Sequence, residues 1–139
     1  EAQLKLYLRR FRSLIQPEFT CIVLDETEKP VAFGLAAPSI AAAIRKSKGR
    51  KFPLGSMRMR CAKKATDTLE FHMLAVRRAY QDKAMNAIIL SHMLEECRKT
   101  GIVRVETGPV AESNHEALHR WNAFAPEIHR RRSCYSKNI

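Results

Sequence analysis

Glu70 and His72 are the residues whose types and spacing best suit acid–base chemistry. They lie two residues apart in residues 69–76, an alternating run that predicts a strand. A carboxylate and an imidazole on one strand face can each accept a proton from a substrate. Tyr135, on the last predicted strand, is a candidate for the complementary acid. The alternative for Glu70 and His72 is that they line an exposed strand face or form salt bridges. The alternative for Tyr135 is a half-buried residue whose hydroxyl is hydrogen bonded.

The segment after this strand has the composition of an anion-binding loop. Residues 76–86 include Arg77, Arg78 and Lys83 and lead directly into a predicted helix. Backbone N–H groups at a helix N-terminus and in the loop before it bind phosphate readily. The sequence therefore predicts a phosphate or pyrophosphate site here, with a solvated basic surface as the alternative.

His115 and His119 form a literal H-E-x-x-H pattern with Glu116 between them. On a helix this spacing puts two imidazoles on one face, as in zinc hydrolases. Such an enzyme needs a third protein ligand, and the remaining chain offers only Glu127 and His129, on or next to a predicted strand. We therefore expect no metal site, and we rank a zinc hydrolase last among the functions considered.

Periodicity and breaker residues predict an α/β domain with a mixed sheet flanked by helices. The predicted helices cover residues 2–15, 39–48, 56–64, 84–99 and 113–123, the last opened by a capping box from Ser113 to Glu116. The predicted strands cover residues 20–24, 31–36, 69–76, 102–107 and 128–135. The first two strands are separated by a polar turn, which indicates a hairpin.

Residues 69–107 read as a strand, a helix and a second strand, and a right-handed crossover makes such strands parallel. Alternation places four residues of the first strand on one face: Leu69, Phe71, Met73 and Ala75. The opposite face carries Glu70, His72, Leu74 and Val76. The predicted core stripe of the helix is Ala87, Leu90, Leu94 and Cys97.

Composition favours one globular domain over residues 1–139. The net charge of +11 indicates anionic partners, either phosphate-bearing ligands, nucleic acid or acidic surfaces. No apolar run approaches the roughly 20 residues of a membrane helix, and no signal peptide is recognisable. The four cysteines are scattered, which predicts mostly buried, reduced thiols in a cytoplasmic protein.

The loop resembles that of the GNAT acyltransferase superfamily, which moves acyl groups from coenzyme A to amines. Val76, Tyr80 and Gln81 match the family spacing, and Ala84 and Asn86 occupy its two glycine positions. The family's Asn-x-x-Ala helix is matched by Asn114, Ala117, Leu118 and Trp121. The positions Gly34, Pro38, Gly49, Arg50, Phe52, Pro53 and Gly55, with the ending at 130–137, resemble a bacterial branch. The likeness covers residues 20–139.

This resemblance implies a GNAT-like fold and acetyl-CoA or another acyl-CoA as cosubstrate. The residues implied in cofactor binding are Leu74, Val76, Tyr80, Gln81, Asp82, Lys83, Ala84, Met85, Asn86, Asn114 and Trp121. Glu70 lies six residues before Val76, and this spacing resembles that of the general-base glutamate in the histone-acetyltransferase branch. Trp121 stands where many relatives carry a tyrosine acid, and Asp82 and Asn86 replace residues with little or no side chain.

The function predicted is acyl transfer to a small-molecule or peptide amine. The alternatives are a catalytically degenerate domain that binds coenzyme A, and an anion- or nucleic-acid-binding domain, although no nucleic-acid motif is present. The family's first strand and helix have no match, which is consistent with a fragment of a longer protein. The acceptor, the acyl chain length and the formation of a homodimer are left open by the sequence.

Overall fold

The computed structural model describes residues 2–12, 15–50, 54–81, 83–119 and 121–137. It divides into two compact units, Glu1–Thr107 and Gly108–Ile139, and each is considered by itself. That all 139 residues form one domain therefore stays a prediction. Among the described helices, even the 16-residue α4 (Met85–Thr100) lacks the length and apolarity needed to cross a membrane.

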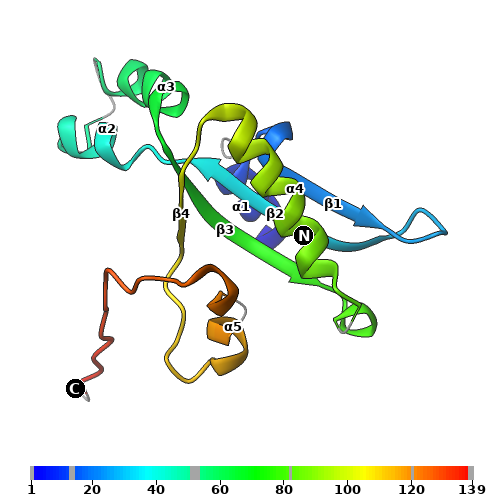
Figure 1. Ribbon diagram of the computed structural model, residues 1–139. Coiled ribbons are helices and arrows are strands. Elements are labelled where there is room, and N and C mark those ends of the chain that lie inside the picture. Colours follow the sequence, from blue (N-terminus) through cyan, green and yellow to red (C-terminus); the bar gives the residue numbers. More distant parts are fainter. Residues whose placement is uncertain (1, 13–14, 51–53, 82, 120, 138–139) are drawn as a thin grey trace. The chain divides into compact units, whose positions relative to one another are not determined.

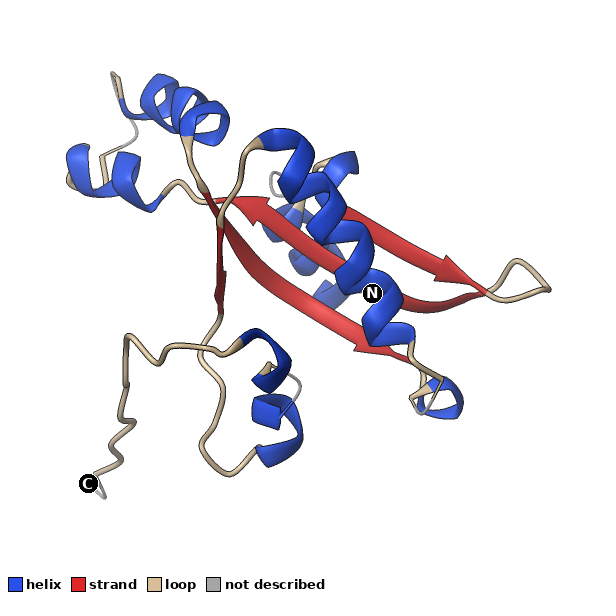
Figure 2. Ribbon diagram, in the orientation of Figure 1, coloured by secondary structure: helices blue, strands red, loops and turns tan. Residues whose placement is uncertain are grey.

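The first unit is built on a four-stranded sheet in the order β1-β2-β3-β4 (Figures 1 and 2). Its strands are β1 (Thr20–Leu24), β2 (Pro30–Pro38), β3 (Thr68–Val76) and β4 (Arg104–Thr107). The first three run antiparallel, and β4 runs parallel to β3. The predicted hairpin and the predicted parallel crossover are both confirmed.

Helix α4 covers one face of this sheet (Figure 1). Ile89, Met93 and Cys97 recur every four residues and are all buried, so they form the helix's contact stripe. A Cβ at Gly34 would collide with Ile89 and lie 2.9 Å from Cε of Met93, so glycine lets the helix approach β2. The predicted stripe was partly wrong, since Ala87 is exposed and Ile89 and Met93 take the central positions.

The other helices of this unit are α1 (Ala2–Phe11), α2 (Ala41–Lys46) and α3 (Gly55–Ala65), with a short turn η1 (Pro17–Phe19). Helix α1 ends earlier than predicted and lies behind the sheet in Figure 1. Both α2 and α3 fall between β2 and β3 in the chain and contact each other. The predicted helix over residues 39–48 is shorter because Ser39 hydrogen bonds to Thr68 and is not yet helical.

The second unit contains α5 (His115–His119) and the turn η3 (Asn122–Phe124). The predicted cap was one residue off, because Asn114 Oδ1 accepts the N–H of Ala117 at 3.1 Å. The strand predicted over residues 128–135 was wrong: residues 125–137 carry no regular secondary structure. The segment has no neighbouring strand to pair with among the described residues of this unit, and local sequence alone does not form a strand.

The prediction that the thiols are mostly buried was wrong, since one of the four is buried. Cys97 is buried and Cys21 is half-buried, and burial raises the pKa of both. Cys61 and Cys134 are exposed. All four are free thiols.

Candidate functional site

The loop from β3 to α4 presents the N-terminus of a long helix. Ala84 lies just before α4 with φ +55°, a left-handed conformation in which L-residues are strained. The first helical hydrogen bonds run from the N–H groups of Ala87 and Ile88 to the Ala84 carbonyl. The N–H groups of Met85 and Asn86 therefore have no hydrogen-bond partner within the helix itself. The helix has no acidic residue in its first turn and no side-chain cap.

Basic residues surround this helix end. Arg77, Arg78 and Lys83 are all exposed, and the Lys83 ammonium lies 4.8 Å from the centre of the Tyr80 ring. Aligned N–H groups and nearby cations together suit a phosphate group. Asn86 is half-buried, and its Oδ1 has no hydrogen-bond partner among the described residues. The predicted contribution of Asp82 lies outside the described residues.

Tyr80 ties the loop to the turn between β1 and β2. Its hydroxyl donates to Asp25 Oδ2 at 3.2 Å, across 55 residues of sequence. The other carboxylate oxygen of Asp25 accepts the Thr27 N–H and hydroxyl and the Lys29 N–H, at 2.7–3.0 Å. These bonds, led by the Thr27 hydroxyl, lower the pKa of Asp25. Burial, followed by the bond to Asp25, raises the pKa of Tyr80.

A β-bulge in β3 changes which residues share a face. Ala36 pairs with Phe71 and Leu35 with Met73, so His72 is the extra residue. Paired residues lie on the same face, and the bulge therefore reverses the alternation after Phe71. Leu74 and Val76 lie with Leu69 and Phe71, on the face that α4 covers. The prediction that Glu70 and Val76 share a face was wrong, because the alternation was extended through the bulge.

Glu70 is half-buried and held by a neighbouring hydroxyl. Ser39 Oγ donates to Glu70 Oε1 at 2.5 Å. Glu70 also pairs in register with Glu106 of β4, so the two carboxylates occupy adjacent positions on one sheet face. Glu106 did not emerge from the sequence analysis. Aligning the two predicted parallel strands would have shown it, had their register been known.

Strand β4 pairs with only the first half of β3. All four of its residues are paired, and the last pair is Phe71 with Thr107. Within the unit that ends at Thr107, the β3 edge from His72 to Val76 therefore has no partner strand among the described residues on this side. Within that unit, the peptide groups of this edge are suited to hydrogen bonding an extended ligand.

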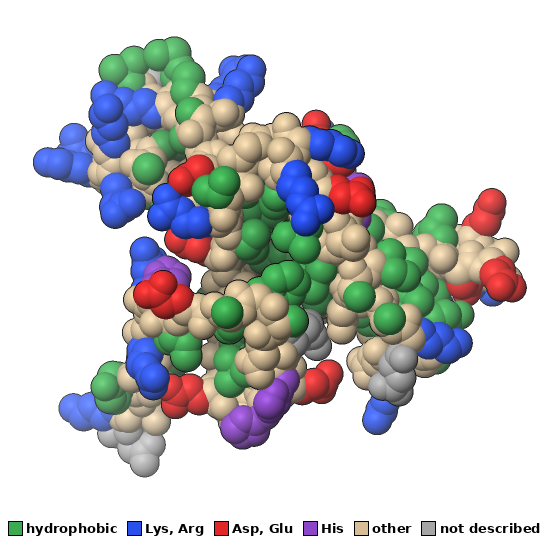
Figure 3. Space-filling view, viewed as in Figure 1, with side chains coloured by type: hydrophobic (Ala, Val, Ile, Leu, Met, Phe, Trp, Pro, Cys, Tyr) green, Lys and Arg blue, Asp and Glu red, His purple; other side chains and the backbone are tan. Residues whose placement is uncertain are grey.

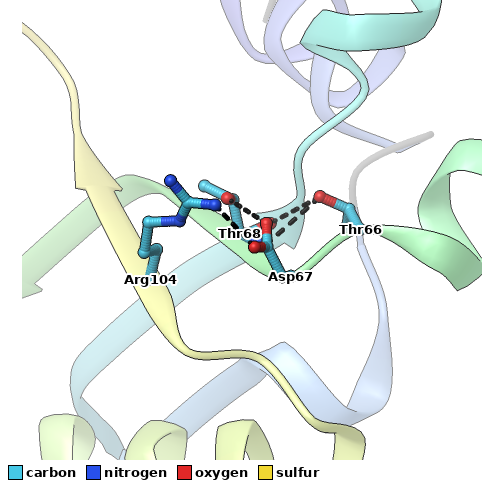
Figure 4. A network of polar contacts seen from close by, with 4 residues as sticks. All are labelled: Thr66, Asp67, Thr68 and Arg104. Atoms are coloured by element: carbon cyan, nitrogen blue, oxygen red, sulfur yellow. Dashed lines mark hydrogen bonds and ion pairs between the residues drawn. The ribbon is translucent and has the colours of Figure 1, made fainter.

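A polar network fixes where these strands begin to pair (Figure 4). The Arg104 guanidinium donates to Asp67 Oδ2 at 2.6 Å, and the Thr68 hydroxyl donates to Asp67 Oδ1 at 2.8 Å. The Asp67 carbonyl accepts the N–H groups of Val103 and Arg104 at 2.9 and 3.1 Å. The Arg104 bond is the main cause that lowers the pKa of Asp67. This network positions Glu106 beside Glu70.

The remaining predicted site residues lie in the second unit. Asn114 caps α5, and Trp121 packs on Phe124 with ring centres 6.2 Å apart. Tyr135 is 93% exposed, so it is not the half-buried residue of the alternative interpretation. The structure does not place any of the three relative to the loop after β3.

The two histidines of the H-E-x-x-H pattern are exposed on the short helix α5. His119 Nδ1 lies 3.0 Å from Asn122 Nδ2, so this ring nitrogen is occupied by an amide contact. In the described part of the chain, no three His, Cys, Asp or Glu side chains gather as a metal ion would require.

Comparison with known proteins identifies the fold. The model of the acetyltransferase (GNAT) family matches residues 2–124, so the chain belongs to this family. No curated protein matches the sequence.

Several solved structures share the fold at low identity. The aminoglycoside acetyltransferase AAC(6')-Iy with a bisubstrate analogue aligns at a TM-score of 0.60 and 11% identity, covering 97% of this chain and 80% of that one. AAC(6')-Ih from Acinetobacter baumannii gives 0.59 and 12%, covering 97% and 81%. A mutant of BH1408 from Bacillus halodurans gives 0.60 and 13%, covering 94% and 73%. The predicted GNAT resemblance and fold class are thus confirmed.

Proposed function

We propose that this protein transfers an acetyl or longer acyl group from coenzyme A to the amine of a small molecule. The observation that carries the proposal is that β4 pairs with only the first half of β3, and that β3 leads into an α4 N-terminus without a side-chain cap. One strand then offers an anion site at its end, an open edge along its second half, and a carboxylate near its start.

The cofactor's pyrophosphate is assigned to the α4 N-terminus. Met85 and Asn86 would supply N–H groups, while Gln81 and Lys83 are exposed beside them. The buried amide of Asn86 would serve the phosphate only through its Nδ2 N–H groups, because Oδ1 and the phosphate oxygens are all acceptors. Leu74 and Val76 would contribute their peptide groups to the extended arm of the cofactor, along the open edge of β3.

Glu70 is assigned as the proton acceptor. It lies six residues before Val76, so a thioester at the end of an arm along β3 would arrive near it. The Glu70 carboxylate takes a proton from the substrate ammonium, and the neutral nitrogen attacks the thioester carbonyl carbon. The C–N bond forms, the C–S bond breaks, and the thiolate leaves with the second proton of the nitrogen. Tyr135 and His72 remain candidates to relay protons.

The Glu70–Glu106 pair favours a cationic acceptor. Two carboxylates on adjacent strands create a negative surface that attracts an ammonium group. Several structural neighbours are described as aminoglycoside acetyltransferases, whose acceptors carry several amines. We therefore place small polyamines of this kind first among the acceptors to be tried.

Titration of the protein with acetyl-CoA, followed by calorimetry and thermal unfolding, tests the proposal. At 100 times the dissociation constant, the ligand should stabilise the fold by about 2.7 kcal/mol. Lys83→Gln should weaken binding roughly five-fold, since one favourable charge at a helix N-terminal site is removed. Arg98→Gln, an exposed residue of the last turn of α4, is the matched control and should change affinity less than two-fold. No stabilisation of folded protein at millimolar acyl-CoA would refute the proposal.

A further inference from the structure

The positive charge of this protein is concentrated in one segment. Residues 39–66 contain nine Lys and Arg and no Asp or Glu, whereas the rest of the chain carries sixteen Lys and Arg against fourteen Asp and Glu. This segment forms α2, α3 and their connections. Figure 3 shows the Lys and Arg side chains gathered over these two helices, at the upper left of the view. Such segregation creates a strong local field for anions.

Within this segment lies a hollow of about 250 Å³. Its lining includes the cationic side chains of Lys46, Lys48, Arg50 and Arg58, together with Ser47 and Gly55. No carboxylate lines it, and none of the four cations forms an ion pair with a described residue. A hollow of this size suits a small anion better than a drug-sized organic molecule.

Gly55 brings a helix N-terminus into the hollow. It is the first residue of α3, which has no side-chain cap and no acidic residue in its first turn. A Cβ at this position would collide with the carbonyl oxygen of Arg50 and lie 3.6 Å from Cβ of Ser47. The absence of a side chain therefore lets the first turn of α3 approach the end of α2. The N–H groups of that turn have no partner within the helix and are natural donors to an anion.

Ser47 provides an independent sign of a ligand. It is only 9% exposed, and its hydroxyl has no hydrogen-bond partner among the described residues. Its oxygen is shielded from solvent, whereas Ser47 as a residue lines the hollow. Buried hydroxyls nearly always have a partner, so this unpartnered one needs an explanation. A phosphate oxygen in the hollow would accept its proton once the side chain turns toward it.

This hollow is separate from the proposed cofactor site. Helix α3 leads into the start of β3, whereas the loop to α4 follows the end of β3. Because β3 has nine residues and rises about 3.3 Å from each to the next, its first and last residues lie roughly 26 Å apart. The pyrophosphate of a cofactor at the α4 N-terminus would therefore not occupy the hollow.

We propose that the hollow between α2 and α3 binds a phosphate group of a small phosphorylated ligand. The four cations supply the charge, the α3 N-terminus and Ser47 supply the hydrogen bonds, and the lack of carboxylates removes repulsion. The inference does not depend on acyl transfer.

The test is a calorimetric titration of the whole chain with inorganic pyrophosphate, with saturating acetyl-CoA present so that the cofactor loop is occupied. The double variant Arg50→Gln, Arg58→Gln should weaken binding at least ten-fold. The matched control Arg60→Gln, Lys64→Gln changes the charge of α3 equally at exposed positions that do not line the hollow, and should weaken binding less than two-fold. Equal weakening by both pairs, or no binding at all, would overturn the proposal.

Two further measurements distinguish a phosphate site from a purely structural Ser47 and from a nucleic-acid surface. Ser47→Ala should weaken pyrophosphate binding several-fold while leaving the Tm of the free protein unchanged or higher, because an unpartnered hydroxyl is removed. A Tm loss with unchanged affinity would overturn the proposal and mark Ser47 as structural. If Lys83→Gln in the absence of acetyl-CoA abolishes all pyrophosphate binding, the cofactor loop is the sole site and the proposal fails. A third outcome is that the protein binds a single-stranded RNA 20-mer but not pyrophosphate, and that both double variants weaken RNA binding equally. This outcome would replace the phosphate site with a nucleic-acid surface.

Discussion

The helix N-termini of α4 and α3 are both suited to an anion, yet they are held in place by different means. At α4, a side-chain bond from Tyr80 to Asp25 fixes the loop, and Ala84 adopts a left-handed conformation. At α3, the close approach of Gly55 to the Arg50 backbone fixes the geometry. We infer that a phosphate site needs little more than a helix end and cations, whereas acyl transfer also needs a carboxylate beside the bound ligand. Glu70 of β3 and Glu106 of β4 are the candidates for this role.

The largest effect on turnover is expected from a substitution of Glu70. The α3 site has no corresponding carboxylate, so this residue distinguishes a site for acyl transfer from a site that only binds anions. Glu70→Gln should lower turnover by about 10²–10⁴-fold, because a general base is lost, and should leave acyl-CoA affinity unchanged. Thiol release from acetyl-CoA with a panel of polyamine acceptors measures it. Glu95→Gln, an exposed position on α4, is the control. Unchanged turnover in Glu70→Gln would remove this residue from the mechanism and make His72→Ala the next variant.

A substitution at Gly55 should break the α3 site and spare the α4 site. Gly55→Ala puts a methyl group against a backbone carbonyl that cannot move freely, so we expect a loss of about 1–3 kcal/mol in the free energy of unfolding. Urea denaturation measures this loss. Pyrophosphate binding should fall, and acetyl-CoA binding should persist. Gly108→Ala has no atom within 4 Å of its Cβ and should be nearly neutral. Equal stability of the two variants would contradict the close contact.

A substitution at Ala84 should improve the α4 site. Because Ala84 has φ +55°, Ala84→Gly should raise the free energy of unfolding by about 1 kcal/mol. Acetyl-CoA binding should become tighter, since the backbone can approach the phosphates more closely. The control Ala87→Gly, in the first turn of α4, should instead destabilise by up to about 1 kcal/mol. A destabilised Ala84→Gly protein would show that the loop conformation is different.

The smallest effect concerns acid. Because the pKa of Asp25 is lowered, its contribution to stability is present above the usual Asp pKa of 3.8 and is lost as the pH falls through the folded-state value. Asp25→Asn should therefore flatten the dependence of Tm on pH below this range. Asp67→Asn should flatten it too, since the pKa of Asp67 is also lowered. Only Asp25→Asn should weaken acetyl-CoA binding at neutral pH, because only Asp25 contacts Tyr80 of the loop. Equal weakening by both variants would show that the Tyr80–Asp25 contact does not position the loop for acetyl-CoA.

Local pattern was sufficient for most elements of the first unit. Strand β1 was predicted at its exact bounds, and β3 and α4 within one residue, because apolar periodicity and Gly101 at the end of α4 are features of neighbouring residues. The same approach failed for residues 128–135. They were predicted as the last strand of the domain, but a strand exists only with a partner, and the sequence does not reveal whether one is present.

The sequence by itself determined the family and the basic character of the chain, and it predicted an anion-binding loop, since these depend on residue types at short spacing. The tertiary structure alone decided which residues meet. The bulge at His72 separates Glu70 from the face of Val76, and the parallel register puts Glu106 beside Glu70. The contact of Gly55 with Arg50 creates the hollow beside Ser47. The physical reason is that register and close packing depend on partners that are distant in the chain. A shift of one residue in the pairing of two strands would change which side chains meet.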